Sequence, residues 1–295
     1  MDRSYEITRR DWLTYAGAAC LAPAFSLPAR AQAPLRFGIV TDAHYCNVGP
    51  RGSRHYRESI AKMRECVDFM NDEKVRFLVE LGDLKDQDEM PDETNTLRYL
   101  AEIESEFKRF DGPRYHVLGN HDLDSISKPQ FLSLTENSGI ERDRSFYSFD
   151  QGGVHFVVLD PCFTSNGADY GHGNFDWTDA NIPPHQLEWL RKDLNQTDAP
   201  TILFIHQLLD GEGSVFIKNA EEVRGVLEES GKVKAVFQGH HHEGQYKKIN
   251  DIHYYTLKAM VEGSGAENNS YAIVDVKPGG LMVTGYRKAV SKSLD

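Results

Sequence analysis

The chain contains few cysteines, and their spacing excludes two common kinds of site. Four occur among 295 residues, and no two of them form a Cys-x-x-Cys pair. Neither a thiolate zinc site nor a dense disulfide framework is therefore indicated. Cys46 lies two residues after His44, but we expect it to be a small buried residue and not a ligand.

Long apolar runs and an excess of positive charge are also absent. The mildly apolar stretch from Tyr15 to Leu27 is interrupted by Gly17 and Pro23, and it is too short for a bilayer-spanning helix of about 20 apolar residues. Asp and Glu outnumber Lys and Arg by 45 to 33, which disfavours electrostatic association with nucleic acid. We expect neither a nucleic-acid partner nor a stable membrane anchor.

The first 33 residues resemble a twin-arginine export signal. Thr8-Arg9-Arg10-Asp11-Trp12-Leu13 precedes the apolar stretch, which is followed by Ala31-Gln32-Ala33. This predicts removal of residues 1–33 and a periplasmic or secreted protein. An ordinary amphipathic helix is the alternative, and lipid attachment at Cys20 is less favoured because the preceding residues lack the usual leucine. Residues 34–295 contain no linker, repeat or low-complexity tract, which predicts a single domain.

Short apolar segments alternate with helical patterns in most of the remaining chain. The predicted buried strands are Leu35 to Thr41, Phe77 to Leu81, Tyr115 to Leu118, Val154 to Leu159, Thr201 to Ile205 and Val233 to Gln238. The predicted helices are His55 to Asn71, Thr94 to Phe110, Pro184 to Leu194 and Ala220 to Glu229. This alternation predicts βαβ units in a largely parallel sheet.

The pattern changes after Gln238. Ile252 to Lys258, Tyr271 to Val276 and Leu281 to Tyr286 read as consecutive strands, with Pro278-Gly279-Gly280 as a turn. These strands predict a second, more antiparallel sheet. The expected fold is α/β, with two facing mixed sheets flanked by helices.

Five polar blocks directly follow apolar runs. They are Asp42-Ala43-His44, Gly82-Asp83, Gly119-Asn120-His121-Asp122, His206 and Gly239-His240-His241-His242. Ligands of open α/β sheets bind beyond the carboxyl ends of the strands, so these blocks are expected to meet in one crevice. Imidazole, carboxylate and amide oxygen together suit borderline divalent ions such as Mn, Fe, Zn or Ni.

Two interpretations of the glycines in these blocks are possible. Gly82, Gly119 and Gly239 either occupy sharp turns where a side chain crowds the backbone or the metals, or serve as ordinary turn residues.

In this order, the blocks resemble the calcineurin-like metallophosphoesterases, over nearly all of residues 34–295. The resemblance implies an α/β/β/α sandwich with two divalent metal ions whose bridging water attacks phosphorus in line. It assigns the ligands Asp42, His44, Asp83, Asn120, His206, His240 and His242, with Asp83 bridging. His121 is then a catalytic residue that binds a phosphoryl oxygen or protonates the leaving group, and Asp122 orients its ring. His241 is not a ligand.

Shorter segments are similar to the manganese-dependent ADP-ribose and CDP-alcohol diphosphatase group. They are Arg54 to Ser59, Met260 to Glu262 and Val283 to Arg287. That group has Gln at the position of His44 and Glu at that of Asp122. The resemblance predicts a phosphodiesterase or diphosphatase acting on a small phosphorylated, nucleotide-like substrate. A phosphate-scavenging phosphomonoesterase is the alternative, and a non-catalytic metal-bound scaffold is less favoured because all seven ligands are present.

A long aromatic segment separates the third and fourth blocks. Pro161 to Pro183 has no helical or strand period and carries Phe163, Tyr170, Phe175 and Trp177. Loops longer than about 15 residues are often lids or binding loops. The rings either stack on a nucleobase or an apolar leaving group, or pin the loop to the domain.

Overall fold

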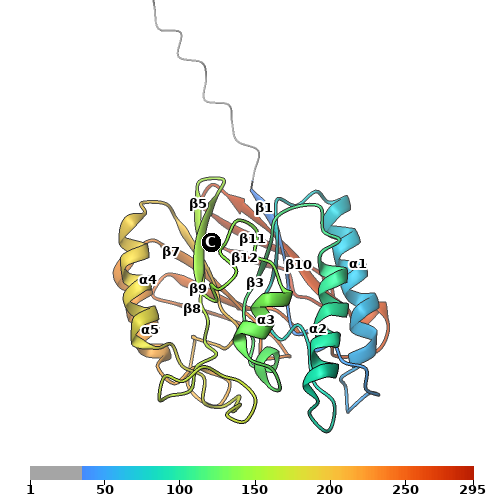
Figure 1. The fold of residues 1–295 in the computed structure, drawn as a ribbon. Helices are drawn as coiled ribbons and strands as arrows, with labels where there is room; N and C mark the ends of the chain where they lie inside the picture. Colours follow the sequence, from blue (N-terminus) through green and yellow to red (C-terminus); the bar gives the residue numbers. More distant parts are fainter. Residues whose placement is uncertain (1–34) are drawn as a thin grey trace, which may run out of the picture. The chain divides into compact units, whose positions relative to one another are not determined.

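The computed structural model describes residues 35–295, which fold into two six-stranded sheets with helices outside them (Figure 1). The predicted export signal lies outside the described residues. The predicted α/β class with two facing mixed sheets is confirmed.

The first sheet carries three parallel strands in its middle and at one edge. Its order is β12 (Lys292–Leu294), β11 (Gly280–Arg287), β10 (Ser270–Lys277), β1 (Arg36–Val40), β2 (Leu78–Glu80) and β3 (Arg114–His116). β1 pairs in parallel with β2, and β2 pairs in parallel with β3. The loops that follow these three strands therefore leave the sheet at the same end, where the carboxyl ends of the strands lie.

The second sheet repeats this arrangement with different strands. Its order is β4 (Tyr147–Gln151), β5 (Val154–Val158), β6 (Thr201–Phe204), β7 (Val233–Gln238), β9 (Ile252–Thr256) and β8 (Gln245–Ile249). β5, β6, β7 and β9 are parallel, while β4 and β8 are antiparallel edge strands.

The prediction that the strands after Gln238 form a separate antiparallel sheet is wrong. β9 extends the parallel run beside β7, whereas β10 crosses to the other sheet and pairs with β1. The first five residues of β10 are buried on both faces, which suits an interior strand covered by helices on one side and by a sheet on the other. The hairpin pattern of β10 and β11 is local, and it does not specify which sheet the hairpin joins.

Helices cover the outer face of each sheet. They are α1 (Ser59–Asp72), α2 (Glu93–Phe107), α3 (Lys128–Leu134), α4 (Pro184–Gln196) and α5 (Ala220–Ser230), with short 3-10 turns at Tyr56–Glu58, His121–Leu123 and Ala266–Asn268. α1, α2 and α3 belong to the core on the first sheet, and α4 and α5 to the core on the second. In Figure 1, α4 and α5 lie on one side of the sheets, and α1 and α2 lie on the other.

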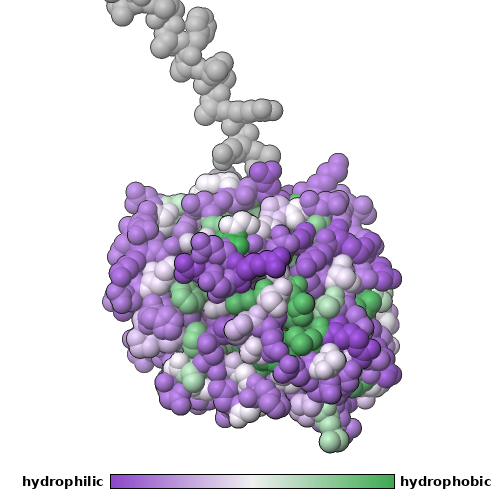
Figure 2. All heavy atoms as spheres, in the orientation of Figure 1, coloured by the Kyte–Doolittle hydropathy of each residue, from purple (hydrophilic) through white to green (hydrophobic). Residues whose placement is uncertain are grey.

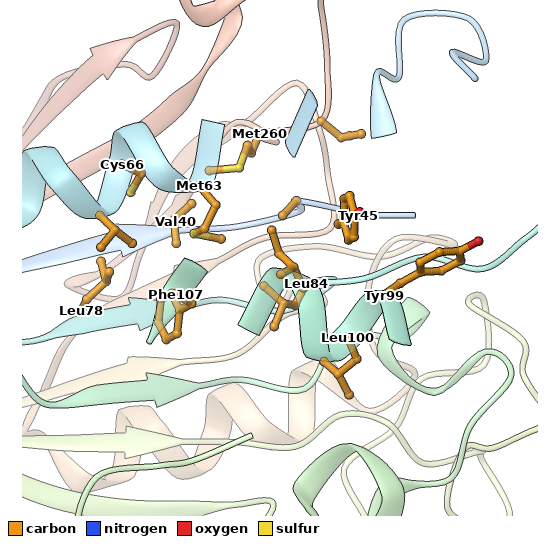
Figure 3. Close-up of a cluster of buried hydrophobic side chains, with 14 of the residues drawn as sticks. Val40, Tyr45, Met63, Cys66, Leu78, Leu84, Tyr99, Leu100, Phe107 and Met260 are labelled. Carbon is orange, nitrogen blue, oxygen red and sulfur yellow. The ribbon is translucent and has the colours of Figure 1, made fainter. Parts of the chain in front are cut away.

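The helices bury one apolar face each. Met63 of α1 and Leu100 of α2 are fully buried beside Val40 and Leu78 of the first sheet (Figure 3). Burying such a side chain stabilises the fold by about 1.5–3 kcal/mol. These contacts therefore hold the helices against the sheet, and they also position the loops that connect the strands to the helices.

Aromatic side chains fill the space between the two sheets. Phe37 of β1 stacks on Phe77 at a centroid distance of 4.9 Å, and its ring meets the edges of Phe156, Phe204 and Phe237 from the other sheet. Aromatic pairs of this geometry contribute about 0.5–1.5 kcal/mol beyond the area that they bury. The aromatic cluster holds the two sheets together and so aligns the carboxyl ends of their strands.

The surface agrees with the acidic composition. The face shown in Figure 2 is mainly hydrophilic, with apolar patches in its centre. In residues 35–295 no helix combines the length and apolar character that crossing a membrane requires. Cys46, Cys66 and Cys162 are buried and unpaired within this part of the chain.

Candidate metal centre

The five polar blocks meet where the carboxyl edges of the two sheets come together. Asp42, Asp83 and Asn120 follow β1, β2 and β3, which are neighbours in the first sheet. His206 follows β6, while His240 and His242 follow β7 in the second sheet. Both sheets thus contribute side chains to a single site, as the placement of the blocks predicted.

Four of the predicted ligands have left-handed backbone conformations. The φ angles of Asp42, His44, Asp83 and His240 are 52°, 46°, 58° and 66°. Residues other than glycine adopt this region at a cost of about 1–3 kcal/mol each, and such residues cluster at functional sites. The turns after β1, β2 and β7 therefore aim side chains into the site at the expense of stability.

The glycines beside these ligands leave no space for a side chain. A Cβ atom at Gly119 would collide with the backbone nitrogen and carboxylate of Asp83, and one at Gly82 would collide with the ring of His206. A Cβ atom at Gly239 would meet Thr41 and Asp42. The crowding interpretation of the three glycines is confirmed.

Three histidines present the same ring nitrogen to the site. The Nδ1 atom of His44 lies 3.1 Å from Asp86, that of His206 lies 2.8 Å from the carbonyl oxygen of Leu81, and that of His242 lies 2.6 Å from Glu262. With the Nδ1 proton donated to these oxygens, each Nε2 atom retains a free lone pair. All three rings are thereby oriented as ligands.

The free Nε2 atoms surround two carboxylate oxygens. Oδ1 of Asp42 lies 3.5 Å from Nε2 of His44 and 3.4 Å from Nε2 of His242, while Oδ2 of Asp83 lies 3.5 Å from Nε2 of His44 and 3.0 Å from Nε2 of His206. Ligands bound at about 2.1 Å to one divalent ion lie about 3.0–3.4 Å from each other. The spacing is that of metal coordination spheres.

Buried atoms without partners mark the same place. In the described chain, Oδ1 of Asp42, Nε2 of His206 and Nε2 of His240 are buried and make no hydrogen bond. Such atoms are costly unless something binds them. One possible ligand group consists of Asp42, His44 and His242 and another of Asp83, His206 and His240, while a third group contains both His44 and Asp83 and so links the first two. The donor set fits two divalent metal ions, with Asp83 close to both groups.

The ligands differ in ionisation before a metal binds. Burial opposes ionisation of Asp42, but the neighbouring His242 and His44 outweigh it and hold the pKa of Asp42 well below its ordinary value. Burial lowers the pKa of His240 to about 3, so its ring is neutral. Burial opposes protonation of His206, but Asp83 raises its pKa to about 9. A metal ion requires both an ionised carboxylate and an unprotonated imidazole, and it would displace the proton of His206 on binding.

Asn120 is also buried at the site. Its Oδ1 atom accepts a hydrogen bond of 3.4 Å from Gln207, while its Nδ2 atom and Oε1 of Gln207 have no partner in the described chain. Exchanging the oxygen and nitrogen of both amides preserves this hydrogen bond with its direction reversed. The exchange also presents the Asn120 oxygen as the ligand that the sequence predicted.

His121 lies beside the ligands, between two carboxylates. Its ring is 4.8 Å from that of His44, and its Nδ1 atom lies 3.6 Å from Asp86 and 3.4 Å from Asp124. Burial opposes protonation, yet Asp86 and Asp83 raise the pKa of His121 well above its ordinary value. Before metal binding, the ring is therefore protonated and able to donate a proton.

The prediction that Asp122 orients the ring of His121 is wrong. Its two oxygens accept backbone N–H groups from Asp83, Leu84 and Gly119 at 2.8–3.0 Å. Asp122 thus braces the loop after β2 against the loop after β3. Burial and the nearby charge of Asp83 raise the pKa of Asp122 to about 6, although the hydrogen bond from the Gly119 amide opposes this.

Sequence reasoning missed two carboxylates that support the ligands. Asp86 contacts His44 and faces His121, and Glu262 holds His242. Asp86 stands three residues after Asp83, and that short spacing was the available signal. Glu262 belongs to one of the segments similar to the diphosphatase group, although the similarity gave it no role.

The site opens into a cavity of about 630 Å³. Besides metal ligands and His121, its lining includes Arg54, Trp177, Val215 and Glu262. In the loop Pro161 to Pro183, the buried rings of Phe163 and Tyr170 attach the loop to the domain, whereas Trp177 is 42% exposed and its ring lies 6.0 Å from that of His240.

Two adjacent carboxylate and imidazole groups at the edge of an α/β/β/α sandwich define a binuclear metal-dependent phosphoesterase. Residues 35–244 match the model of the calcineurin-like phosphoesterase family. The chain belongs to this family, and the resemblance found in the sequence is confirmed. The protein is therefore a phosphoesterase, and its donor set fits two divalent metal ions.

Individual relatives agree in function class and fold. The chain is 27% identical to a manganese-dependent ADP-ribose/CDP-alcohol diphosphatase from Oryza sativa subsp. japonica, over 85% of this chain and 91% of the relative. It is 24% identical to the protein of the same name from Arabidopsis thaliana, over 91% and 96%. A dimetal phosphatase from Danio rerio has the same fold, with a TM-score of 0.76, 20% identity and coverage of 88% and 98%.

Proposed function

We propose that this protein is a manganese-dependent diphosphatase that cleaves the diphosphate bond of nucleotide-like substrates of the ADP-ribose or CDP-alcohol class. The observation that carries the proposal is the presence of a guanidinium group and an indole ring in the cavity that holds the metal ligands. Relatives named as manganese-dependent diphosphatases support both the substrate class and the metal.

Arg54 supplies a binding group for a second phosphate. Its side chain is 35% exposed in the cavity lining, and its Nε atom lies 3.6 Å from Glu262, which also holds His242. A monoester places one phosphoryl group at the metal ligands and needs no further cation. A diphosphate places a second negative group beside them, and a guanidinium binds such oxygens in a bidentate manner.

The chain's own residues divide the remaining work. When bound, two divalent ions polarise phosphoryl oxygens and supply an activated water. His121 donates a proton to the departing phosphate oxygen, a role worth about 10² to 10⁴ in rate, and Asp86 keeps its ring in place. Trp177 offers a flat apolar face to the organic part of the substrate.

Activity assays test the proposal directly. The manganese-loaded protein is expected to hydrolyse ADP-ribose or a CDP-alcohol with kcat/KM well above that for p-nitrophenyl phosphate. Faster turnover of the monoester than of either diphosphate would overturn the proposal and favour a phosphomonoesterase.

An arginine pair provides a matched test of the second phosphate site. Arg54→Met is expected to raise KM for the diphosphate about tenfold or more while changing that for the monoester little, because only the diphosphate presents a second charge. Arg57→Met is the control, since Arg57 is three residues away and donates to Asn47 at the surface. An equal rise in KM for both substrates would show that Arg54 does not bind the second phosphate.

A further inference from the structure

A second cavity lies next to the metal site and has no role in the chemistry described so far. It has a volume of about 590 Å³ and is bounded by the first turn of α5 and the loop before it. Thr178 and Ser214 line it, whereas their chain neighbours Trp177 and Val215 line the metal-site cavity. The two cavities therefore flank one ridge, formed by residues 177–178 of one loop and 214–215 of the other.

The lining of the second cavity is of mixed polarity and electrically balanced, with Ile217 and Ala220 as its larger apolar side chains. Its polar side chains are Thr178, Glu212, Ser214, Lys218, Glu221 and Arg224. The positive charges of Lys218 and Arg224 are offset by the carboxylates of Glu212 and Glu221. An anion gains little from such a lining, and an apolar group leaves its polar atoms unpaired.

Several of these side chains are exposed to solvent and have no protein partner in the described part of the chain. Within residues 35–295, the side chains of Glu212, Ser214, Lys218 and Glu221 make no hydrogen bond or ion pair. Together they offer both donors and acceptors. Hydroxyl groups, which donate and accept at once, are the chemistry that matches such a mixed lining.

We propose that the second cavity binds a neutral polyhydroxylated portion of the substrate, such as a sugar or glycerol unit attached to the phosphate at the metal site. This rests on the proposed function, and it specifies where the group beyond the diphosphate lies. The terminal ribose of ADP-ribose is a group of this kind. The ridge then separates the metal-site cavity, which takes the phosphates, from the cavity that selects the substituent.

Calorimetric titration of the metal-loaded protein tests the proposal without any turnover. Inorganic phosphate and ribose 5-phosphate share the charged end, and only the latter carries a polyol. Ribose 5-phosphate is expected to bind about tenfold or more tightly, a difference of about 1.4 kcal/mol. Ser214→Trp places a large ring in the second cavity and is expected to abolish this difference.

The same substitution elsewhere controls for general effects of tryptophan. Ser105 is exposed on α2, and Ser105→Trp is expected to retain the preference for ribose 5-phosphate. Equal affinity of the two ligands for the wild-type protein, or a preference that survives Ser214→Trp, would overturn the proposal. A protein that shows the preference but cleaves no diphosphate retains the second cavity as a polyol site and contradicts only the diphosphatase assignment.

Discussion

Glu262 accepts a hydrogen bond from His242 at 2.6 Å, across 20 residues of sequence. This bond lowers the pKa of Glu262 to about 2 and fixes which nitrogen of His242 faces the metal. Glu262→Gln is expected to weaken metal affinity about 10- to 100-fold, as is typical of such supporting residues. Manganese titration by calorimetry measures the change.

Glu267→Gln provides the matched control, because Glu267 is exposed in the turn that follows. Its metal affinity is expected to equal that of the wild-type protein. Unchanged affinity in Glu262→Gln would show that His242 is held by other contacts.

Asp86 supports a metal ligand and the proton donor together, through His44 and His121. Asp86→Asn is expected to weaken metal binding and to lower kcat by about 10² or more. The loss should be greater for a poor alcohol leaving group than for p-nitrophenolate, which departs with little protonation. His121→Asn should show the same dependence on leaving group with metal affinity retained. A loss independent of the leaving group would contradict proton donation by His121.

Gly119 is predicted to tolerate no side chain. Gly119→Ala places a methyl group against Asp83, and it is expected to cost about 2 kcal/mol or more of unfolding free energy and to abolish high-affinity metal binding. Gly225→Ala is the control: it lies within α5 with open space around it, and it is expected to stabilise the protein by about 0.5–1 kcal/mol. Urea unfolding and metal titration measure both variants. Normal metal binding by Gly119→Ala would contradict the conclusion that a side chain at this position displaces Asp83.

His155 links three elements in a pH-dependent way. Its ring contacts Asp193 of α4 and Asp150 of β4, each at 2.8 Å, and the hydrogen bond to Asp193 is the main cause of its raised pKa. The folded protein therefore binds this proton more tightly than the unfolded chain does. The resulting stability is fully present below the unfolded pKa of about 6.5 and is lost as pH rises through the folded pKa.

The difference in unfolding free energy between wild-type protein and His155→Gln reports this contribution. It is expected to be about 1–2 kcal/mol at mildly acidic pH and to shrink at alkaline pH. His172→Gln, in an exposed part of the Pro161 to Pro183 loop, is the control and is expected to change the unfolding free energy by less than about 0.5 kcal/mol. A difference that grows with pH would contradict the assigned ion pairs.

We propose that residues 1–33 direct export by the twin-arginine route, which is suggested by Arg9 and Arg10 in their sequence context. Replacing both with lysine is expected to leave the unprocessed protein in the cytoplasm, as cell fractionation and immunoblotting would show. Arg3→Lys is the control and is expected to be exported. Cytoplasmic location of the unaltered protein would contradict the proposal.

The metal centre was accessible to sequence reasoning because its ligands follow strands. Apolar runs identified the strands, and parallel strands end at a common edge, so residues as distant as Asp42 and His242 were expected to meet. The block order then indicated the family. Strand partners were less accessible, because the pattern of β10 is the same whether it pairs with β1 or only with β11.

The sequence by itself determined the fold class, the place of the site and the types of its ligands, because these depend on hydrophobic periodicity and on side-chain chemistry along the chain. Only the tertiary structure decided which carboxylates support the ligands: Asp86 and Glu262 hold histidines, while Asp122 binds backbone amides. It also decided that Trp177 faces the metal site and that a second cavity lies beyond it. Such contacts depend on a few ångströms of packing between loops from different strands, and no local pattern records that distance.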